Sequence, residues 1–451
     1  MKTLSSILAV LLLFNTWIFA TSINGYVKAP LSSNIISEEF KNTLFSDSGT
    51  VKTLFRTDID SLKITIMGSS VAWGSGATSN QGYNFFYTQL LSQRSKENKG
   101  LNWNVINKSI GGNTTQNVLD RWDRDLVSQK GKYVIYGLSL GNEGIHDAAN
   151  QQKIFDQWKN NMLRLIDMAR EKGMTPVIIN NYTRADYNAS DYDYIKKMDL
   201  LIHEWDVASV NVLGAIDDGA GHWAGGYQND NAHPNDAGHK EFFYSMVPSL
   251  FDAISTGKPQ PKIITGNYMV LKTNEKLSFT PENIAHPFTL SFDIKTTGSG
   301  TIASFIQSEK KGIISIDSKT GVVVYQSPNG NPIKGSIAIN DGKWHKITLT
   351  HFFARGETRL YNDDVAVGLT FERLTPTDFF INDINGPKSI NYRGLFFYRA
   401  GMNKEEIEAL NQGKMLKSSL EIYAPLNGQA KNQSEQLFNY AQSTNKILLI
   451  P

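Results

Sequence analysis

The sequence predicts two folded domains, an α/β domain over residues 62–255 and an antiparallel β-sandwich over residues 263–451. In the first region, short runs rich in β-branched residues alternate with stretches of helical periodicity, which is typical of a parallel sheet covered by helices on both faces. In the second, short strand-like runs follow one another with turn residues between them, which is typical of a sandwich. Between them TGKPQPK, residues 256–262, combines a glycine, two prolines and lysines, as a linker does.

The elements of the first domain follow from local periodicity. The helix prediction is clearest over residues 151–171, where apolar residues recur at three- and four-residue spacings, so we expect that stripe to pack in the core. The expected strands are LKITIMG, WNVINKS, YVIYGLSL, TPVIINNYT and VASVNVLG.

The second domain shows strand patterns and a single short helix, expected from Lys404 to Gly413. Its expected strands are FTLSFDIKT, TIASFIQ, GIISI, VVVYQ, WHKITLTHF, RLYNDDVAVG and GLFFYR.

The composition of the 451 residues limits the partners and the chemistry. Hydrophobic residues make up 40% and charged residues 20%, which are ordinary globular values. The 45 basic and 43 acidic residues nearly balance, and no basic block stands out, so we expect neither nucleic acid nor an anionic membrane as partner. The chain has no cysteine, which excludes disulfides, thiol catalysis and a lipid-modified cysteine.

The amino terminus resembles a secretory signal. Lys2 precedes an apolar run from Ile7 to Phe14, and Ala20 is a suitable last residue before cleavage. The run is far shorter than the ~20 residues of a membrane-spanning helix. We therefore expect a signal peptide over residues 1–20, an extension over 21–61 and a secreted or periplasmic protein without a membrane span.

Three residues suit nucleophilic catalysis at the end of the predicted parallel sheet. Ser70 lies just past the carboxyl end of the first strand, where open α/β sheets place their ligands. Asp230 and His233 are three residues apart in a loop before the last helix of the domain. At that spacing the carboxylate can hold one imidazole nitrogen while the other faces a serine.

Two further positions suit the stabilisation of an oxyanion. Gly112 follows the second strand within a glycine pair, where backbone N–H groups can approach a bound oxygen closely. Asn142 follows the third strand and offers an amide, which is a neutral hydrogen-bond donor.

In this order the blocks GSSVAWG, SIGGNTT, LGNE and DNAH resemble the SGNH, or GDSL-type, hydrolase family. The resemblance implies a flavodoxin-like three-layer α/β/α fold and a serine esterase that needs no cofactor. It implies Ser70 as the nucleophile and an oxyanion hole formed by Ser70, Gly112 and Asn142. The chain departs from the family pattern at Ser69 and Glu143, which stand in place of two aspartates.

The Asp-x-x-His block of that family is intact, so the resemblance implies that Asp230 orients His233, the general base. An alternative nucleophile is Ser139, because GLSLG fits the Gly-x-Ser-x-Gly elbow. We disfavour it because the following NEGIHD is predicted as a loop, whereas an elbow leads into a helix.

Three histidines near Asp230, namely His222, His233 and His239, raise the possibility of a metal site. No HExxH spacing is present, and His233 already belongs to the family block, so we expect no metal.

The second domain resembles the laminin-G and concanavalin-like family in DGKWHKI, RLYNDDVAVG and RGLFFY. That resemblance implies a jelly-roll sandwich of a kind that often binds carbohydrate or acts as an adhesive module. The alternative is that Trp344 packs in the core and the domain only supports the enzyme. A secreted esterase with such a domain is predicted to remove O-acetyl groups from a polysaccharide or glycan, with His222, Trp223 and Tyr227 as weak candidates for substrate contact. The alternatives are a lipase or thioesterase for longer acyl chains, and a noncatalytic glycan-binding protein with a degenerate hydrolase domain.

Overall fold

A computed structural model describes residues 59–428 and 436–450. The predicted signal peptide lies outside the described residues, as does nearly all of the predicted extension. Among the described residues, no helix has the length and apolar character needed to cross a membrane.

The first domain contains a five-stranded parallel sheet in the order β2-β1-β3-β4-β5. This is the flavodoxin-like strand order, and it confirms the predicted fold class. Each strand coincides with a predicted run. Strand β1 begins two residues before its run, and the other four are shorter than or shifted from theirs by a few residues. The strands are β1 (Asp60–Gly68), β2 (Asn104–Asn107), β3 (Gly131–Gly137), β4 (Thr175–Ile179) and β5 (Ala208–Val210).

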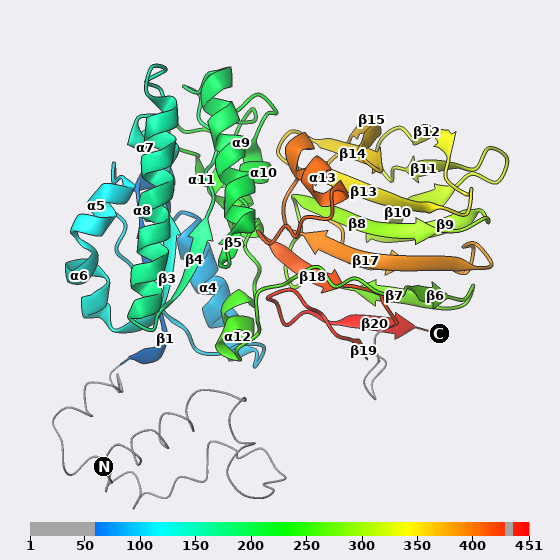
Figure 1. Cartoon of the computed structure of the whole chain (residues 1–451), viewed down its shortest axis with the longest axis horizontal. Coiled ribbons are helices and arrows are strands. Elements are labelled where there is room, and N and C mark those ends of the chain that lie inside the picture. Colours follow the sequence, from blue (N-terminus) through cyan, green and yellow to red (C-terminus); the bar gives the residue numbers. More distant parts are fainter. Residues whose placement is uncertain (1–58, 429–435, 451) are drawn as a thin grey trace, which may run out of the picture. The chain divides into compact units, whose positions relative to one another are not determined.

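Helices cover both faces of this sheet (Figure 1). One face packs on α4 (Tyr83–Lys96), α11 (Asp236–Tyr244) and α12 (Leu250–Ser255). The other packs on α8 (Gln151–Glu171) and α9 (Ala189–Glu204), as predicted for residues 151–171. Short helices in the connections are α3 (Ser70–Trp73), η2 (Thr78–Asn80), α5 (Thr115–Asp120), α6 (Trp122–Asp125), η3 (Val127–Gln129), α7 (Leu140–Glu143) and α10 (Leu213–Ile216).

The second domain consists of two antiparallel sheets around a common apolar core, which confirms a β-rich second domain. One sheet has the order β12-β11-β10-β9-β16-β7-β20-β19 and the other β15-β14-β13-β8-β17-β18, with β6 paired to β17. Strand β8 shows how the core forms, because its alternate residues Phe288, Leu290, Phe292 and Ile294 are all fully buried within it.

The second domain contains every element predicted for it and several further strands. The predicted helix is α13 (Lys404–Asn411), and RLYNDDVAVG forms the hairpin of β14 (Glu357–Asn362) and β15 (Val365–Phe371). The other predicted strands are β8 (Phe288–Lys295), β9 (Gly300–Gln307), β10 (Lys310–Ile316), β11 (Val322–Gln326), β13 (Trp344–Phe352) and β17 (Ile390–Tyr398). Strands that the sequence analysis missed are β6 (Met269–Leu271), β7 (Lys276–Phe279), β12 (Ile333–Ala338), β16 (Phe379–Ile381), β18 (Leu420–Ala424), β19 (Gln436–Leu437) and β20 (Ile447–Ile450).

A buried polar interface joins the two domains. The guanidinium of Arg399, from the sandwich, is fully buried and pairs with Glu421. Its Nη1 donates hydrogen bonds to the carbonyl oxygens of Tyr244 on α11 (3.0 Å) and Ile284 (2.7 Å). Because a buried charge is stable only when it is paired and hydrogen-bonded, this arginine ties the sandwich to the α/β domain.

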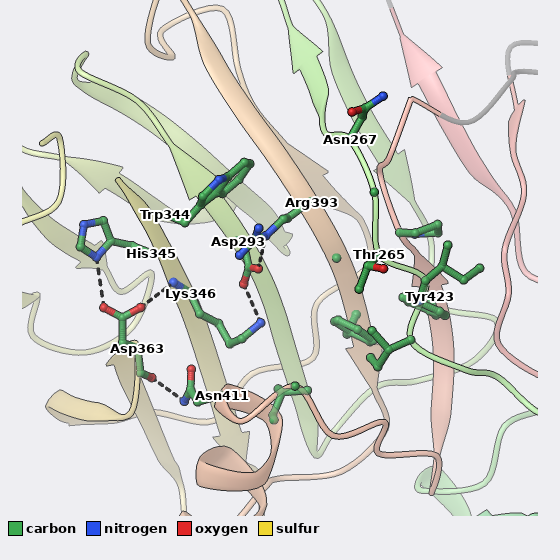
Figure 2. Close-up of a pocket in the computed structure, with 18 of the residues that line it drawn as sticks. Thr265, Asn267, Asp293, Trp344, His345, Lys346, Asp363, Arg393, Asn411 and Tyr423 are labelled. Carbon is green, nitrogen blue, oxygen red and sulfur yellow. Dashed lines mark hydrogen bonds and ion pairs between the residues drawn. The ribbon is translucent and has the colours of Figure 1, made fainter. Parts of the chain in front are cut away.

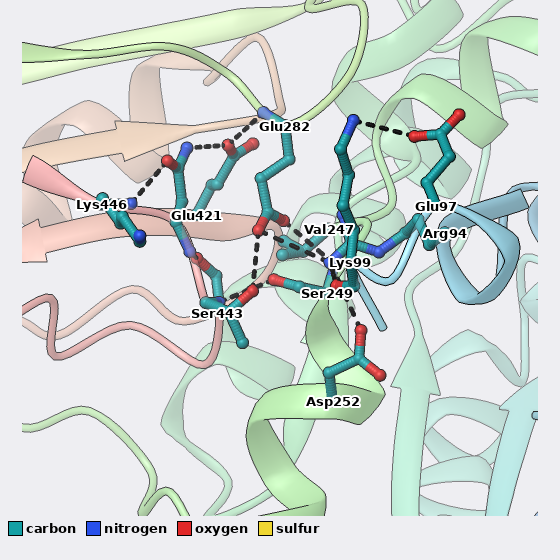
Figure 3. Close-up of polar contacts among 12 residues, drawn as sticks. Arg94, Glu97, Lys99, Val247, Ser249, Asp252, Glu282, Glu421, Ser443 and Lys446 are labelled. Carbon is teal, nitrogen blue, oxygen red and sulfur yellow. Dashed lines mark hydrogen bonds and ion pairs between the residues drawn. The ribbon is translucent and has the colours of Figure 1, made fainter. Parts of the chain in front are cut away.

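A second group of polar contacts lies beside it (Figure 3). Arg94 of α4 pairs with Asp252 of α12 at 3.3 Å and lies 3.9 Å from Glu282 of the sandwich. The Glu282 carboxylate also accepts a hydrogen bond from the backbone N–H of Ser249 at 3.1 Å. Charged and polar groups of the two domains therefore pair with one another at this interface.

The segment predicted as a linker follows the surface of the sandwich and contains no helix or strand. Lys258 Nζ donates to the carbonyl oxygen of Ser443 at 2.6 Å, and the carbonyl oxygen of Lys258 accepts from Gln442 Nε2 at 3.2 Å. Lys258 therefore attaches the segment to the second domain.

Candidate active site

Ser70 lies where β1 ends and α3 begins. The glycines on either side are required by close packing. A Cβ on Gly68 would lie 2.4 Å from the Ala72 side chain, and Gly74, with φ 111°, would place one 2.1 Å from the carbonyl oxygen of Asn80. The motif GSSVAWG therefore forms a tight strand-to-helix junction that presents Ser70 at the carboxyl edge of the sheet.

Ser70, His233 and Asp230 form a hydrogen-bonded chain. Ser70 Oγ lies 2.9 Å from His233 Nε2, and His233 Nδ1 lies 2.9 and 3.0 Å from the two carboxylate oxygens of Asp230. An ionised carboxylate only accepts hydrogen bonds, so Nδ1 carries the imidazole proton and Nε2 is free to accept the serine proton. The His233 side chain keeps 24% of its surface exposed, so the site is open to solvent.

The Asp230 carboxylate also organises the loop that carries His233. It accepts the backbone N–H groups of Ala232 at 2.8 Å and of His233 at 2.9 Å. Partial burial acts to raise the pKa of Asp230, but the hydrogen bonds from His233 and Ala232 outweigh it and hold that pKa below its usual value. Gly76 lies against this loop, since a Cβ there would come within 2.1 Å of the Pro234 carbonyl oxygen.

The predicted oxyanion donors Gly112 and Asn142 lie in the connections that follow β2 and β3. Gly112 adopts φ 74°, and a Cβ on the preceding Gly111 would have only the Ser70 Cβ within 4 Å, at 3.9 Å. Gly111 therefore lies next to Ser70, and a Cβ on Gly112 would meet nothing within 4 Å. Asn142, on α7, donates through Nδ2 to the carbonyl oxygen of Asn113 at 3.2 Å. A carboxamide nitrogen carries two hydrogens, so one more donor remains on Asn142.

Ser69 and Glu143, which depart from the family pattern, make contacts that the sequence did not predict. Glu143 accepts a hydrogen bond from the N–H of Thr115, at the start of α5, and so connects the Asn142 segment to the Gly112 loop. Burial, the largest influence, raises the pKa of Glu143 although Thr115 opposes the shift. Ser69 is fully buried, and its N–H donates to the carbonyl oxygen of Gly137 at 3.1 Å.

Ser139, the alternative nucleophile, has a capping role. It is fully buried, and its Oγ accepts the N–H of Gly141 at 3.2 Å as the N-cap of α7. The loop predicted for NEGIHD is confirmed over residues 144–147, but Asn142 and Glu143 belong to α7, the single helical turn that follows Ser139. The Ser139 hydroxyl nevertheless faces the amino terminus of α7. The His233 imidazole is hydrogen-bonded to Ser70.

The three weak candidates for substrate contact differ in burial. Trp223 is only 5% exposed, stacks on Tyr182 at 5.8 Å and donates from Nε1 to the Asn231 carbonyl oxygen. It therefore supports the loop that carries His233. Tyr227 is partly buried, while the half-exposed His222 lies 2.8 Å through Nε2 from the carbonyl oxygen of Tyr187.

His239, considered above as a metal ligand, is engaged with the backbone. Its Nδ1 accepts the N–H of Tyr83 at 3.3 Å and its Nε2 lies 2.9 Å from the carbonyl oxygen of Ser75. Burial lowers the pKa of His239 to about 4. Both nitrogens thus serve the packing of α11 against the Ser70 segment.

A buried group outside this site also has a metal-like composition, namely Asp199, His203 and Glu406. His203 Nδ1 accepts the N–H groups of Lys417 and Ser418 at 3.0 and 3.1 Å, so the proton of the neutral imidazole is on Nε2, facing Glu406 at 3.2 Å. A protonated nitrogen is not a metal ligand, so the group acts as a hydrogen-bond network between the domains.

Comparison with known protein families agrees with this geometry. Residues 66–241 match the model of the GDSL-like Lipase/Acylhydrolase family. The α/β domain is therefore a GDSL-like lipase/acylhydrolase domain, and this class hydrolyses esters. The match confirms the resemblance stated from the four sequence blocks. No curated protein matches the chain.

Several solved structures are similar to part of this chain at low sequence identity. A protein described as lipolytic and of the G-D-S-L family from Desulfitobacterium hafniense is 15% identical over 40% of this chain and 95% of its own, with a TM-score of 0.33. An acetyl xylan esterase from Geobacillus stearothermophilus is 18% identical over 42% and 94%, with a TM-score of 0.34.

Proposed function

We propose that this protein is an exported serine esterase that removes O-acetyl, or other short acyl, groups from a polysaccharide or glycan. The observation that carries the proposal is the hydrogen-bonded chain from Ser70 Oγ through His233 to Asp230. The ester-hydrolase class of the α/β domain supports it.

The proposed reaction has two half-reactions. In the first, Ser70 Oγ attacks the ester carbonyl carbon while its proton passes to His233 Nε2, and the tetrahedral intermediate then collapses as His233 returns the proton to the leaving alcohol. In the second, a water molecule attacks the acyl carbon and gives a proton to His233. The bond from that carbon to Ser70 Oγ then breaks as His233 returns the proton to Ser70 Oγ, which releases the carboxylic acid. Asp230 stabilises the imidazolium that forms in both half-reactions.

The oxyanion of each tetrahedral intermediate is proposed to bind the N–H groups of Ser70 and Gly112 and the free Nδ2 hydrogen of Asn142. The first N–H groups of a helix have no partner within it, and Ser70 opens α3. Removing one such donor typically costs on the order of 10²–10³ in kcat.

The choice of a short acyl group and a sugar alcohol rests on architecture, because the hydrolase domain is followed by a β-rich domain of the kind that the sequence analysis associates with carbohydrate. Export is proposed from residues 1–20, and mass spectrometry of the mature protein tests it by locating the new amino terminus after Ala20.

The test of the function is acetate release from a panel of acetylated polysaccharides by the wild type and by Ser70→Ala. We expect release by the wild type and a loss of at least a thousandfold in the variant. Aryl acetate and aryl octanoate are then compared, and a strong preference for octanoate would contradict a deacetylase and favour a lipase or thioesterase.

A further inference from the structure

The sandwich contains a hollow of about 550 Å³ that shares no residue with the candidate active site (Figure 2). Its walls are the extended segment 263–267, the outer face of strands β8, β13 and β17, and the end of α13. The volume falls in the ~300–1,000 Å³ range of small-molecule sites.

A cross-strand group of charges forms the floor. Asp293 on β8 is paired in register with Lys346 on β13 and with Arg393 on β17. Its carboxylate bonds Lys346 Nζ at 2.5 Å and Arg393 Nε at 2.8 Å. Asp293 and Lys346 are largely buried, whereas the Arg393 side chain is 44% exposed. The network therefore holds an arginine in place with its terminal nitrogens toward the hollow.

Aromatic rings stand beside this arginine. The Arg393 guanidinium lies over the Trp344 ring at 4.2 Å, and Tyr268, whose side chain is 46% exposed, lies 5.9 Å from Trp344 between ring centroids. A β-bulge follows Arg393, and its Gly394 has φ 60°. Bulges of this kind redirect side chains and are frequent next to binding sites.

The charges of the hollow indicate a neutral ligand. Its lining includes three carboxylates, on Asp293, Asp363 and Asp364, and two cations, on Lys346 and Arg393. The surplus carboxylates would repel an anionic ligand, and the Arg393 guanidinium would repel a cationic one. Hydroxyl groups both donate and accept hydrogen bonds, so a polyhydroxylated ligand matches this mixture of donors and acceptors.

We propose that this hollow binds a short stretch of a neutral glycan, with sugar hydroxyls on Arg393 and Asp363 and an apolar sugar face on Trp344, which lines the hollow beside the arginine. The site would hold the polysaccharide while the α/β domain acts on its esters. The inference rests on the proposed function in taking a glycan as the ligand.

Affinity electrophoresis of full-length Ser70→Ala protein tests the proposal without turnover. The gels contain xylan, galactomannan or β-glucan as neutral probes and polygalacturonate as the acidic one. We expect retardation by at least one neutral probe, and a dissociation constant raised at least tenfold by adding Arg393→Ala or Trp344→Ala. The control is Phe371→Ala, which removes a 71% exposed ring of β15 that does not line the hollow, and it should bind as the parent does.

Three outcomes would overturn the proposal, namely no retardation by any probe, equal retardation of parent and variants, or retardation by polygalacturonate alone. Thermal unfolding checks that each variant is folded, and Trp344→Ala decides if Arg393→Ala does not fold. Acetate release by the wild type is measured separately, so a protein that binds without releasing acetate contradicts the esterase proposal and leaves the glycan site standing.

Discussion

The substitution Asn142→Ala tests the proposed oxyanion hole in detail. The Asn142 amide donates one hydrogen to the carbonyl oxygen of Asn113 at 3.2 Å, and the second is proposed to bind the oxyanion. The structural bond contributes about 0.5–1.5 kcal/mol to stability. The catalytic bond is made in the transition state, where losing one donor costs about 2.7–4 kcal/mol of activation free energy.

The two contributions can be measured separately. Steady-state hydrolysis of an aryl acetate should show kcat reduced about 10²–10³-fold with KM nearly unchanged, while urea unfolding shows a loss of no more than about 1.5 kcal/mol. Asn142→Asp should be slower still, because a carboxylate opposes the oxyanion and cannot donate to it. A kcat of Asn142→Ala within fivefold of the wild type would refute the assignment, and so would a loss that tracks the folded fraction alone.

Three other predictions concern buried groups. Ser139→Ala should retain kcat within about twofold but lose about 1 kcal/mol of stability by urea unfolding, because its Oγ caps α7; abolished hydrolysis would contradict this. Arg399→Met should cost about 3–5 kcal/mol because Glu421 is left buried without its partner, and calorimetry should show one transition for both domains, whereas two separated transitions would contradict the shared interface. Burial holds the pKa of His239 at about 4, so below pH 6.5 the unfolded chain binds a proton that the folded chain does not. Stability should therefore fall as the pH decreases from 6.5 towards 4, and His239→Gln should reduce the loss between pH 7.5 and pH 5 by about 2 kcal/mol; an unchanged loss would contradict it.

Much of the candidate site was predictable because parallel strands bring their carboxyl ends to one edge of a sheet. Ser70, Gly112 and Asn142 each follow a different strand, so strand prediction alone placed them together, and the short Asp230 to His233 spacing placed the carboxylate on the imidazole. The role of Glu143 was not predictable in the same way, because its contact with Thr115 joins two loops whose approach depends on the packed sheet.

Several of the missed strands lack the alternation on which strand prediction depends. In β18, LEIYA, every residue is buried because both faces are covered, and in β12, IKGSIA, most residues are exposed. Strand β16 has only three residues.

The interface between the domains was also hidden from sequence. Arg399 and Tyr244 are 155 residues apart, and in sequence Arg399 has the character of a surface charge. Only the folded chain shows that its guanidinium is fully enclosed.

The central claim is that Ser70 is the nucleophile of a hydrolase. Its most direct test is labelling of the folded protein with a fluorophosphonate, followed by peptide mass spectrometry. The predicted result is one phosphonyl adduct, on Ser70, that forms at least a hundredfold more slowly in His233→Ala. A folded protein that remains unlabelled, or one labelled at Ser139, would contradict the account.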